Sequence, residues 1–101
     1  MVNIIENWTE VTGEISDIVV EQTLKNFHTV ILRIMEMKDV EHFPNLIRPD
    51  AQNEIPVRLP SDVIQTLNLK KGDKINALIR TAGLNLYFFR QDSIKVVNNH
   101  G

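Results

Sequence analysis

The chain of 101 residues contains no cysteine and only one tryptophan, one tyrosine and four phenylalanines. Without cysteine there can be no disulfide, thiolate nucleophile or cysteine-ligated zinc. No apolar run approaches the length of a membrane span, and the N-terminus lacks the basic start and apolar stretch of a signal peptide. We therefore expect one soluble, cytoplasmic domain over residues 1–101, with no membrane partner.

Charge is spread unevenly along the chain. The net charge is −2, too acidic for a protein whose whole surface attracts phosphate. Residues 1–54 hold ten acidic and four Lys or Arg side chains, whereas residues 55–101 hold three acidic and seven Lys or Arg side chains. This asymmetry predicts a local basic surface on an acidic body.

Most of the chain has the pattern of β-strands, with β-branched and apolar residues in alternating positions. Gly13, inside the first such segment, indicates a bulge or a sharp bend. Pro56 and Pro60 confine the third segment to a sheet edge or a bulge. The five predicted strands cover residues 11–21, 30–37, 55–60, 73–81 and 86–97.

One short helix, residues 61–68, is predicted between the third and fourth strands. Ser61 is the expected N-cap. Val63, Ile64 and Leu67 recur at helical spacing and are expected to pack on the core. The order of strand, strand, loop, strand, helix, strand and strand fits a small Greek-key barrel closed at one end by the helix.

Three segments outside these elements have distinct compositions. Residues 38–54 have mixed polarity and two prolines, which predicts a long loop. After the helix, Lys70 and Lys71 would complement its dipole, and Gly72 would supply a left-handed stop. Residues 98–101 are expected to form a short flexible tail.

Five stretches in this order, which cover most of residues 9–97, are "VTGEI", "FHTVILRI", "IPVRLPSDVIQTL", "LKKGDKINALI" and "YFFRQDSIKVV". They resemble the OB-fold family, and in particular bacterial single-stranded-DNA-binding proteins and the small primosomal replication protein. The resemblance implies an all-β fold, a five-stranded OB-like Greek-key barrel with one short helix between strands 3 and 4. It also implies non-catalytic binding of single-stranded nucleic acid in replication or repair, with DNA favoured over RNA.

Two other resemblances cover less of the chain. The stretch "IPVRLPSDVIQTLNLKKGDKINALI" is similar to swapped-hairpin transcription regulators, which are duplex-DNA-binding dimers. The stretches "TGEISDI" and "KKGDKINALIRTAGLNLYF" are similar to small oxyanion-binding barrels appended to transporter ATPases. A further alternative is an OB-like scaffold or interaction protein of a larger assembly, since OB folds serve many tasks.

The candidate binding residues are arginines and aromatics expected on the outside of the barrel. Outward arginines on barrel strands suit a groove that follows a sugar–phosphate backbone, and exposed rings stack bases. If Phe88 faces the core, its neighbours Tyr87 and Phe89 face outward. The expected contacts are Arg33, Phe43, Arg48, Arg58, Arg80, Tyr87, Phe89 and Arg90.

Several of these residues also have a purely structural interpretation. Arginine is a common surface residue, and Phe89 could cover the barrel end or a subunit contact instead of a base. Lys70 and Lys71 are expected to act only at the helix end, and Trp8 to fasten the N-terminal arm to the barrel.

Catalysis finds little support in the sequence. The histidines are scattered, and Asp39, Glu41 and His42 make only a weak metal-binding pattern. No nucleophile elbow, phosphate-binding glycine loop or metalloprotease helix is present. We predict no enzyme, no cofactor and no bound metal.

The second strand predicts a homodimer. Its residues 30–37 are largely apolar on both faces, and a single barrel covers only one face. Ile31, Met35 and Met37, together with Leu78 on another strand, would then need a second cover. A second copy of the chain would supply it, although the long loop is an alternative within the same chain.

Overall fold

The computed structural model of the chain describes residues 6–20, 25–83 and 86–97. The tail expected over residues 98–101 lies outside these ranges. The described elements are β1 (Thr9–Val20), β2 (Phe27–Asp39), β3 (Glu54–Pro60), α1 (Ser61–Leu67), β4 (Lys74–Gly83), β5 (Leu86–Phe89), the 3-10 helix η1 (Gln91–Ser93) and β6 (Lys95–Val96).

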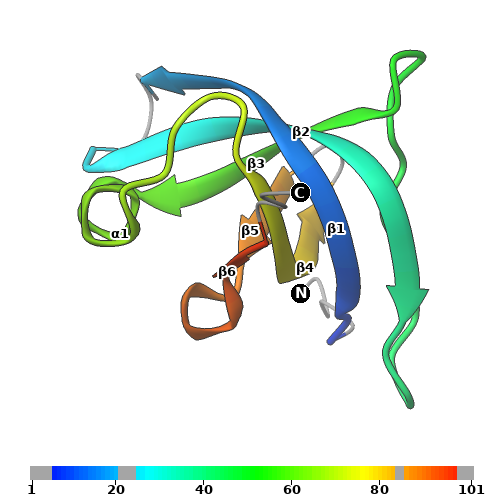
Figure 1. Cartoon of the computed structure of the whole chain (residues 1–101). Coiled ribbons are helices and arrows are strands. Elements are labelled where there is room, and N and C mark those ends of the chain that lie inside the picture. Colours follow the sequence, from blue (N-terminus) through cyan, green and yellow to red (C-terminus); the bar gives the residue numbers. More distant parts are fainter. Residues whose placement is uncertain (1–5, 21–24, 84–85, 98–101) are drawn as a thin grey trace.

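Five strands close into a barrel (Figure 1). The strand order is β1, β2, β3, β5, β4, and β4 returns to β1. The β3–β5 pairing is parallel and the others are antiparallel. The all-β, OB-like fold with one short helix between the third and fourth strands is therefore confirmed. The short strand β6, which the sequence pattern had merged with β5, pairs with the start of β4, on the edge with which β5 pairs further along the strand.

The core follows from the period-two pattern of the strands. Ile55, Val57 and Leu59 of β3 are buried, while the intervening Pro56 is exposed. On β4 the same alternation buries Ile75, Ala77 and Ile79. Successive side chains of a strand point to opposite faces, so one face of each strand fills the barrel.

Gly13 lies at a β-bulge, although the extra residue is Met35 of the facing strand β2 rather than a residue of β1. The register between β1 and β2 shifts between Thr12 and Gly13. A Cβ atom on Gly13 would lie 2.5 Å from the carbonyl oxygen of Arg33 and 2.9 Å from Cγ of Leu32. Only glycine allows the two strands to approach this closely, so its role here is close packing.

The same bulge changes the faces of β2. Met35 has no register partner on β1, and Met37 is paired with Val11. Val11 is fully buried, and register partners share a face of the sheet, so Met37 lies on the core face of the strand. The register therefore separates the faces of Met35 and Met37, but both side chains are exposed as the prediction requires, Met35 by 56% and Met37 by 36%.

Helix α1 occupies the predicted place but differs at both ends. Pro60 takes the N-cap position, and Ser61 is the first helical residue, without a side-chain cap. The hydroxyl of Ser61 instead lies 2.6 Å from Nδ1 of His28. At the C-terminus Asn68, with φ of 54°, adopts the left-handed cap that the sequence had assigned to Gly72. Val63, Ile64 and Leu67 pack against the core, as predicted.

Lys70 is explained by a buried carboxylate rather than by the helix dipole. No basic residue lies in the last turn of α1. The backbone N–H of Lys70 donates to Oδ2 of Asp73 at 3.1 Å, and its Nζ lies 3.5 Å from Oδ1. Asp73 is only 4% exposed, and its carbonyl accepts from the N–H of Ile15 at 2.8 Å. This turn therefore joins α1 to β1.

The predicted long loop spans residues 40–53, between β2 and β3. Ile47 of this loop is buried in the core. Asn53 ties the end of the loop to β2, because its Nδ2 donates to the carbonyl of Ile34 at 2.6 Å and its carbonyl accepts from the N–H of Ile34 at 2.8 Å. Within the described ranges, no helix has the length and apolar character needed to cross a bilayer.

Candidate nucleic-acid interface

Three cross-strand partners form a row on the outer surface of the barrel. Arg58 of β3 is in register with Phe88 of β5, and Phe88 with Arg80 of β4. Their chain neighbours Val57 and Tyr87 are buried, so the side chains of the row point away from the core. Arg58, Phe88 and Arg80 are each partly exposed, and we call them the basic-aromatic row.

A second ring supports the phenylalanine of this row. Phe27 of β2 contacts Phe88 edge to face, with 6.5 Å between ring centroids and 86° between ring planes. Such a pair contributes about 0.5–1.5 kcal/mol beyond area burial. Both rings are partly exposed, so an aromatic surface is open to solvent beside the two arginines.

Arg80 carries an unused hydrogen-bond donor. Its Nε is buried and has no hydrogen-bond partner within the part of the chain that the structure describes. A guanidinium presents its donors as a rigid planar fork, which matches the oxygen atoms of a phosphate. The basic-aromatic row thus places two arginines on either side of a partly exposed ring.

Arg90 lies next to this row, in a different electrostatic setting. Its backbone N–H donates to the carbonyl of Leu78 at 2.9 Å, which places it beside β4. Its Nε donates to Oδ1 of Asp92 at 2.9 Å, and its Cζ lies 5.9 Å from the ring centroid of Trp8. The charge of Arg90 is therefore shared with a carboxylate and a ring, so we expect it to attract phosphate less strongly than Arg80.

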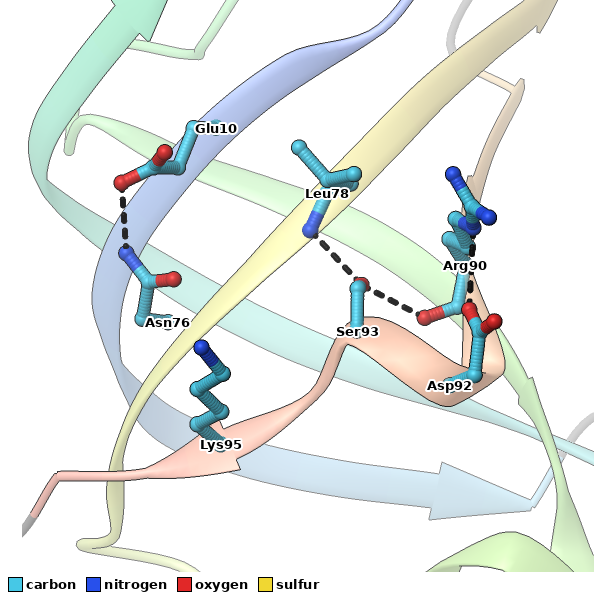
Figure 2. Close-up of a pocket in the computed structure, with 7 residues that line it drawn as sticks. All are labelled: Glu10, Asn76, Leu78, Arg90, Asp92, Ser93 and Lys95. Atoms are coloured by element: carbon cyan, nitrogen blue, oxygen red, sulfur yellow. Dashed lines mark hydrogen bonds and ion pairs between the residues drawn. The ribbon is translucent and has the colours of Figure 1, made fainter.

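Figure 2 shows the open hollow that Arg90 lines, with a volume of about 340 Å³. In it, Nδ2 of Asn76 donates to Oε2 of Glu10 at 3.2 Å, and Oγ of Ser93 accepts from the N–H of Leu78 at 2.9 Å. Acidic and basic groups alternate around the wall. The residues that line the hollow are Glu10, Asn76, Leu78, Arg90, Asp92, Ser93 and Lys95.

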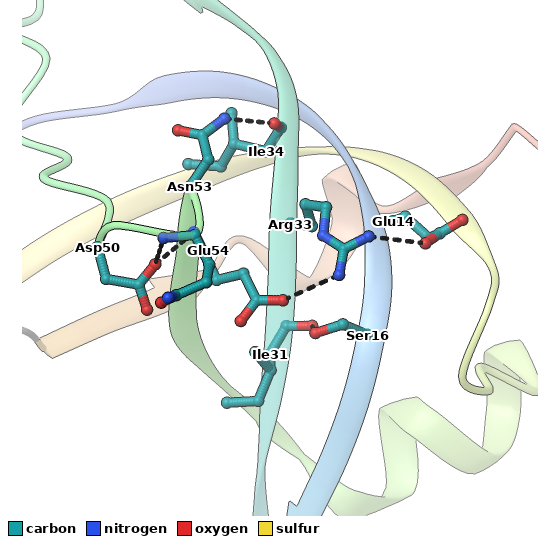
Figure 3. A network of polar contacts seen from close by, with 9 residues as sticks. Glu14, Ser16, Ile31, Arg33, Ile34, Asp50, Asn53 and Glu54 are labelled. Atoms are coloured by element: carbon teal, nitrogen blue, oxygen red, sulfur yellow. Dashed lines mark hydrogen bonds and ion pairs between the residues drawn. The ribbon is translucent and has the colours of Figure 1, made fainter.

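Arg33 is held by two carboxylates (Figure 3). Its Nη1 lies 3.9 Å from Oε1 of Glu14, and its Nη2 lies 3.5 Å from Oε2 of Glu54. Glu14, Arg33 and Glu54 are register partners across β1, β2 and β3, and we call them the acidic-flanked row. Arg33 faces outward as predicted, but its immediate surroundings are net negative.

The two loop candidates lie apart from the basic-aromatic row. Figure 1 shows the loop over residues 40–53 on the opposite side of the barrel from α1, whereas Arg58 lies close to the α1 end of β3. Phe43 is partly exposed, and Nη1 of Arg48 donates to the carbonyl of Ile47 at 3.0 Å. The structure does not bring Phe43 or Arg48 together with the strand arginines.

The predicted outward orientation of Tyr87 and Phe89 is wrong. Both side chains are buried, with 2% and 6% exposure, so neither can stack a base. The hydroxyl of Tyr87 accepts from the N–H of Arg48 at 3.0 Å and donates to its carbonyl at 3.3 Å. This pair of hydrogen bonds lets a tyrosine lie in the core and fastens the long loop to β5.

The partly exposed aromatics beside the strand arginines are instead Phe88 and Phe27, neither of which the sequence predicted as a contact. Phe88 was assigned to the core because "LYFF" contains no polar residue to set the alternation. Phe27 was missed because its segment has the polar composition of a turn. Arg90 follows β5 and must reach solvent. Counting the alternation of side chains back from Arg90 would have assigned Phe88 to the outside.

Within the described ranges, no group of three or more His, Asp or Glu side chains is arranged to hold a metal ion. No family model matches the chain, and neither a curated protein nor a solved structure shows a significant match to it.

Proposed function

We propose that the protein binds single-stranded nucleic acid, with DNA in replication or repair as the first expectation, through the basic-aromatic row of its OB-like barrel. The observation that carries this proposal is the register of Arg58, Phe88 and Arg80, which puts one partly exposed ring between two outward arginines. The function is binding without catalysis, and it would be exercised in the cytoplasm.

The spacing of the row suits a single strand that crosses β3, β5 and β4. Neighbouring strands lie about 4.8 Å apart, so the backbones of Arg58 and Arg80 flank Phe88 on its two sides. A base stacked on the ring would contribute roughly 1–3 kcal/mol. The phosphates before and after that base would then each meet one guanidinium.

The net charge of −2 is compatible with this role because the charges are segregated. Residues 55–101, which include all three residues of the row, carry a net charge of +4. Exposed charges act on a ligand only within about a Debye length, about 8 Å at physiological salt. The local surface therefore decides the attraction of phosphate, more than the sum over the chain.

The test is a fluorescence-anisotropy titration of labelled oligo-dT, an oligoribonucleotide and a short duplex, at several salt concentrations. Wild-type protein should bind the single strands, and log K should fall linearly with log of the salt concentration. The Arg58→Ala, Arg80→Ala pair should weaken binding and flatten the slope by about 0.7 for each lost contact.

The matched control is the Lys70→Ala, Lys71→Ala pair, which removes the same charge from a different surface and should keep the wild-type slope. If both pairs of substitutions weakened binding equally, the effect would come from net charge alone, which would contradict the proposed interface. Preferential binding of the duplex would favour the swapped-hairpin alternative. Absence of binding to all three ligands would leave the scaffold alternative.

We also propose that the protein forms a homodimer through the hairpin of β1 and β2. Its support is the exposure of apolar side chains on these two strands, Met35 by 56% and Met37 by 36% on β2 and Val19 by 46% on β1. A second copy would bury these side chains. Sedimentation equilibrium at tens of micromolar protein should give twice the monomer mass of 11.6 kDa, and the monomer mass would reject the dimer.

A further inference from the structure

The acidic-flanked row lies on the face that receives oligonucleotides in OB folds, the face of strands 2 and 3. Glu14, Arg33 and Glu54 follow one another across β1, β2 and β3, in register. Figure 3 shows the guanidinium of Arg33 between the two carboxylates. The arginine on this face is therefore already occupied by acceptors from its own barrel.

Two further carboxylates add negative charge to the same face. Asp17 and Asp50 line, together with Glu54, a hollow of about 550 Å³ whose other walls include Ile31 and Pro56. Oδ1 of Asp50 accepts the N–H of Glu54 and that of Gln52, each at 2.9 Å, which holds this carboxylate beside β3. Around the acidic-flanked row and this hollow, these four acids outnumber Arg33, the arginine that the row contains.

A phosphate on this face would meet net repulsion. A phosphate that bound Arg33 would lie beside the carboxylates of Glu14 and Glu54, whose like charges would repel it. Glu54 and Arg58 are four residues apart on β3, a separation of roughly 13 Å at the usual strand rise. The repulsive region therefore ends about where the basic-aromatic row begins.

We propose that Glu14 and Glu54 are specificity-determining residues, which keep Arg33 from phosphate and confine the bound strand to the β3–β5–β4 side of the barrel. This inference rests on the proposed function. Its consequence is a short site that stops at β3, so the protein engages fewer phosphates than a barrel that also uses the face of strands 2 and 3. Specificity here comes from repulsion as well as from attraction.

The experiment compares the Glu14→Gln, Glu54→Gln pair with wild type in the oligo-dT titration. Glutamine keeps the size of the side chain and removes only the charge. Release of Arg33 should add one phosphate contact, which steepens the salt slope by about 0.7. Between about 50 and about 200 mM salt, the affinity of this variant should therefore fall by a factor about three times larger than that of wild type. Thermal melting followed by circular dichroism confirms that both proteins are folded.

Two controls isolate Arg33. The Asp39→Asn, Glu41→Gln pair removes the same charge from the end of β2 and from the loop that follows it, farther along the chain from Arg33, and should keep the wild-type slope. Adding Arg33→Ala to the Glu14→Gln, Glu54→Gln pair should abolish the gain, whereas Arg33→Ala alone should leave wild-type binding unchanged.

The outcomes separate this inference from the proposed function. If wild type binds and the Glu14→Gln, Glu54→Gln pair has the wild-type slope, the inference is overturned and the basic-aromatic row stands. If the gain survives Arg33→Ala, it comes from net charge and the inference is again overturned. If no variant binds a single strand at low salt, the proposed function itself fails, and the inference with it.

Discussion

Two rows of three residues cross the outer surface of this barrel, and strand β3 contributes to both. In the acidic-flanked row, one arginine lies between Glu14 and Glu54, whereas in the basic-aromatic row one ring lies between Arg58 and Arg80. The arginines of both rows face outward. The difference between the rows teaches that the cross-strand partners of an outward arginine set its surroundings, which are two carboxylates for Arg33 and an aromatic ring for Arg58 and Arg80.

The two rows also differ in how the backbone supports them. The acidic-flanked row crosses β1 and β2 beside the bulge at Gly13, and Gly13 lies next to Glu14 in the chain. The basic-aromatic row crosses β3, β5 and β4, where two paired positions join β3 to β5. We therefore expect substitutions beside the acidic-flanked row to change mainly stability, and substitutions in the basic-aromatic row to change mainly binding.

The largest effect is expected from Gly13→Ala. The added methyl would lie 2.5 Å from the carbonyl oxygen of Arg33, so β1 and β2 must move apart. Such overpacking costs about 1–3 kcal/mol, and here the obstacle is backbone that cannot rotate away. Urea unfolding should show this loss of the free energy of unfolding.

Gly83→Ala is the matched control for this change. Its methyl would meet Cβ of Leu86 at 3.8 Å, an ordinary van der Waals contact. The free energy of unfolding should stay within about 0.5 kcal/mol of wild type. Equal stability of the two variants would contradict the close approach of β1 and β2 that supports the acidic-flanked row.

Phe88→Ala tests the ring of the basic-aromatic row. If a base stacks on Phe88, its loss should weaken binding of oligo-dT by roughly 1–3 kcal/mol. The salt slope should stay near that of wild type, because no phosphate contact is removed. Met35→Ala removes an exposed apolar side chain from another part of the barrel and should leave affinity unchanged, so equal losses would argue against a specific stacking site.

Tyr87→Phe tests the opposite face of the same strand. The change leaves the N–H and carbonyl of Arg48 without the hydroxyl at 3.0 and 3.3 Å, at an expected cost of about 0.5–1.5 kcal/mol. Binding by the folded protein should not change, since Tyr87 is buried. A loss of affinity larger than the loss of stability would mean that the faces of β5 are assigned wrongly.

The sequence predicted the barrel well where its strands alternate. In β3 and β4 each apolar residue is separated from the next by a polar residue or a proline over much of the strand, so the buried face could be read directly. The segment "LYFF" has no such alternation. Its orientation is decided by the hydroxyl of Tyr87, which finds both its partners on Arg48, 39 residues away in the chain. No local pattern contains that contact.

The candidate site was predictable only in part for a related reason. Arg58 and Arg80 were correctly placed on outer faces, because that depends on the parity of one strand. The neutralisation of Arg33 depends on the register of three strands, which brings Glu14 and Glu54 to its two sides. Which face a residue lies on can be inferred from the alternation within a single strand. The register between strands can be inferred only when the position of the bulge and the pairing of the strands are known.

The smallest effect is expected at Lys70 and Lys71, the pair that also serves as the charge control. Lys70→Ala removes an ion pair with the buried Asp73, but this carboxylate keeps its hydrogen bond from the backbone N–H of residue 70. The Lys70 side chain is 69% exposed, so the pair is worth between about 0 and 1 kcal/mol. Lys71 is exposed, and its loss should change stability by less than about 0.5 kcal/mol.

A comparison of the two single variants by urea unfolding decides the role of this basic turn. A measurable loss for Lys70→Ala and none for Lys71→Ala is expected if the turn acts by holding Asp73 against β1. Equal losses would instead favour a general effect of charge near the end of α1. If either lysine variant kept its stability but flattened the salt slope as much as Arg80→Ala does, the basic surface would extend past α1. The contrast between the two rows would then no longer define where phosphate binds.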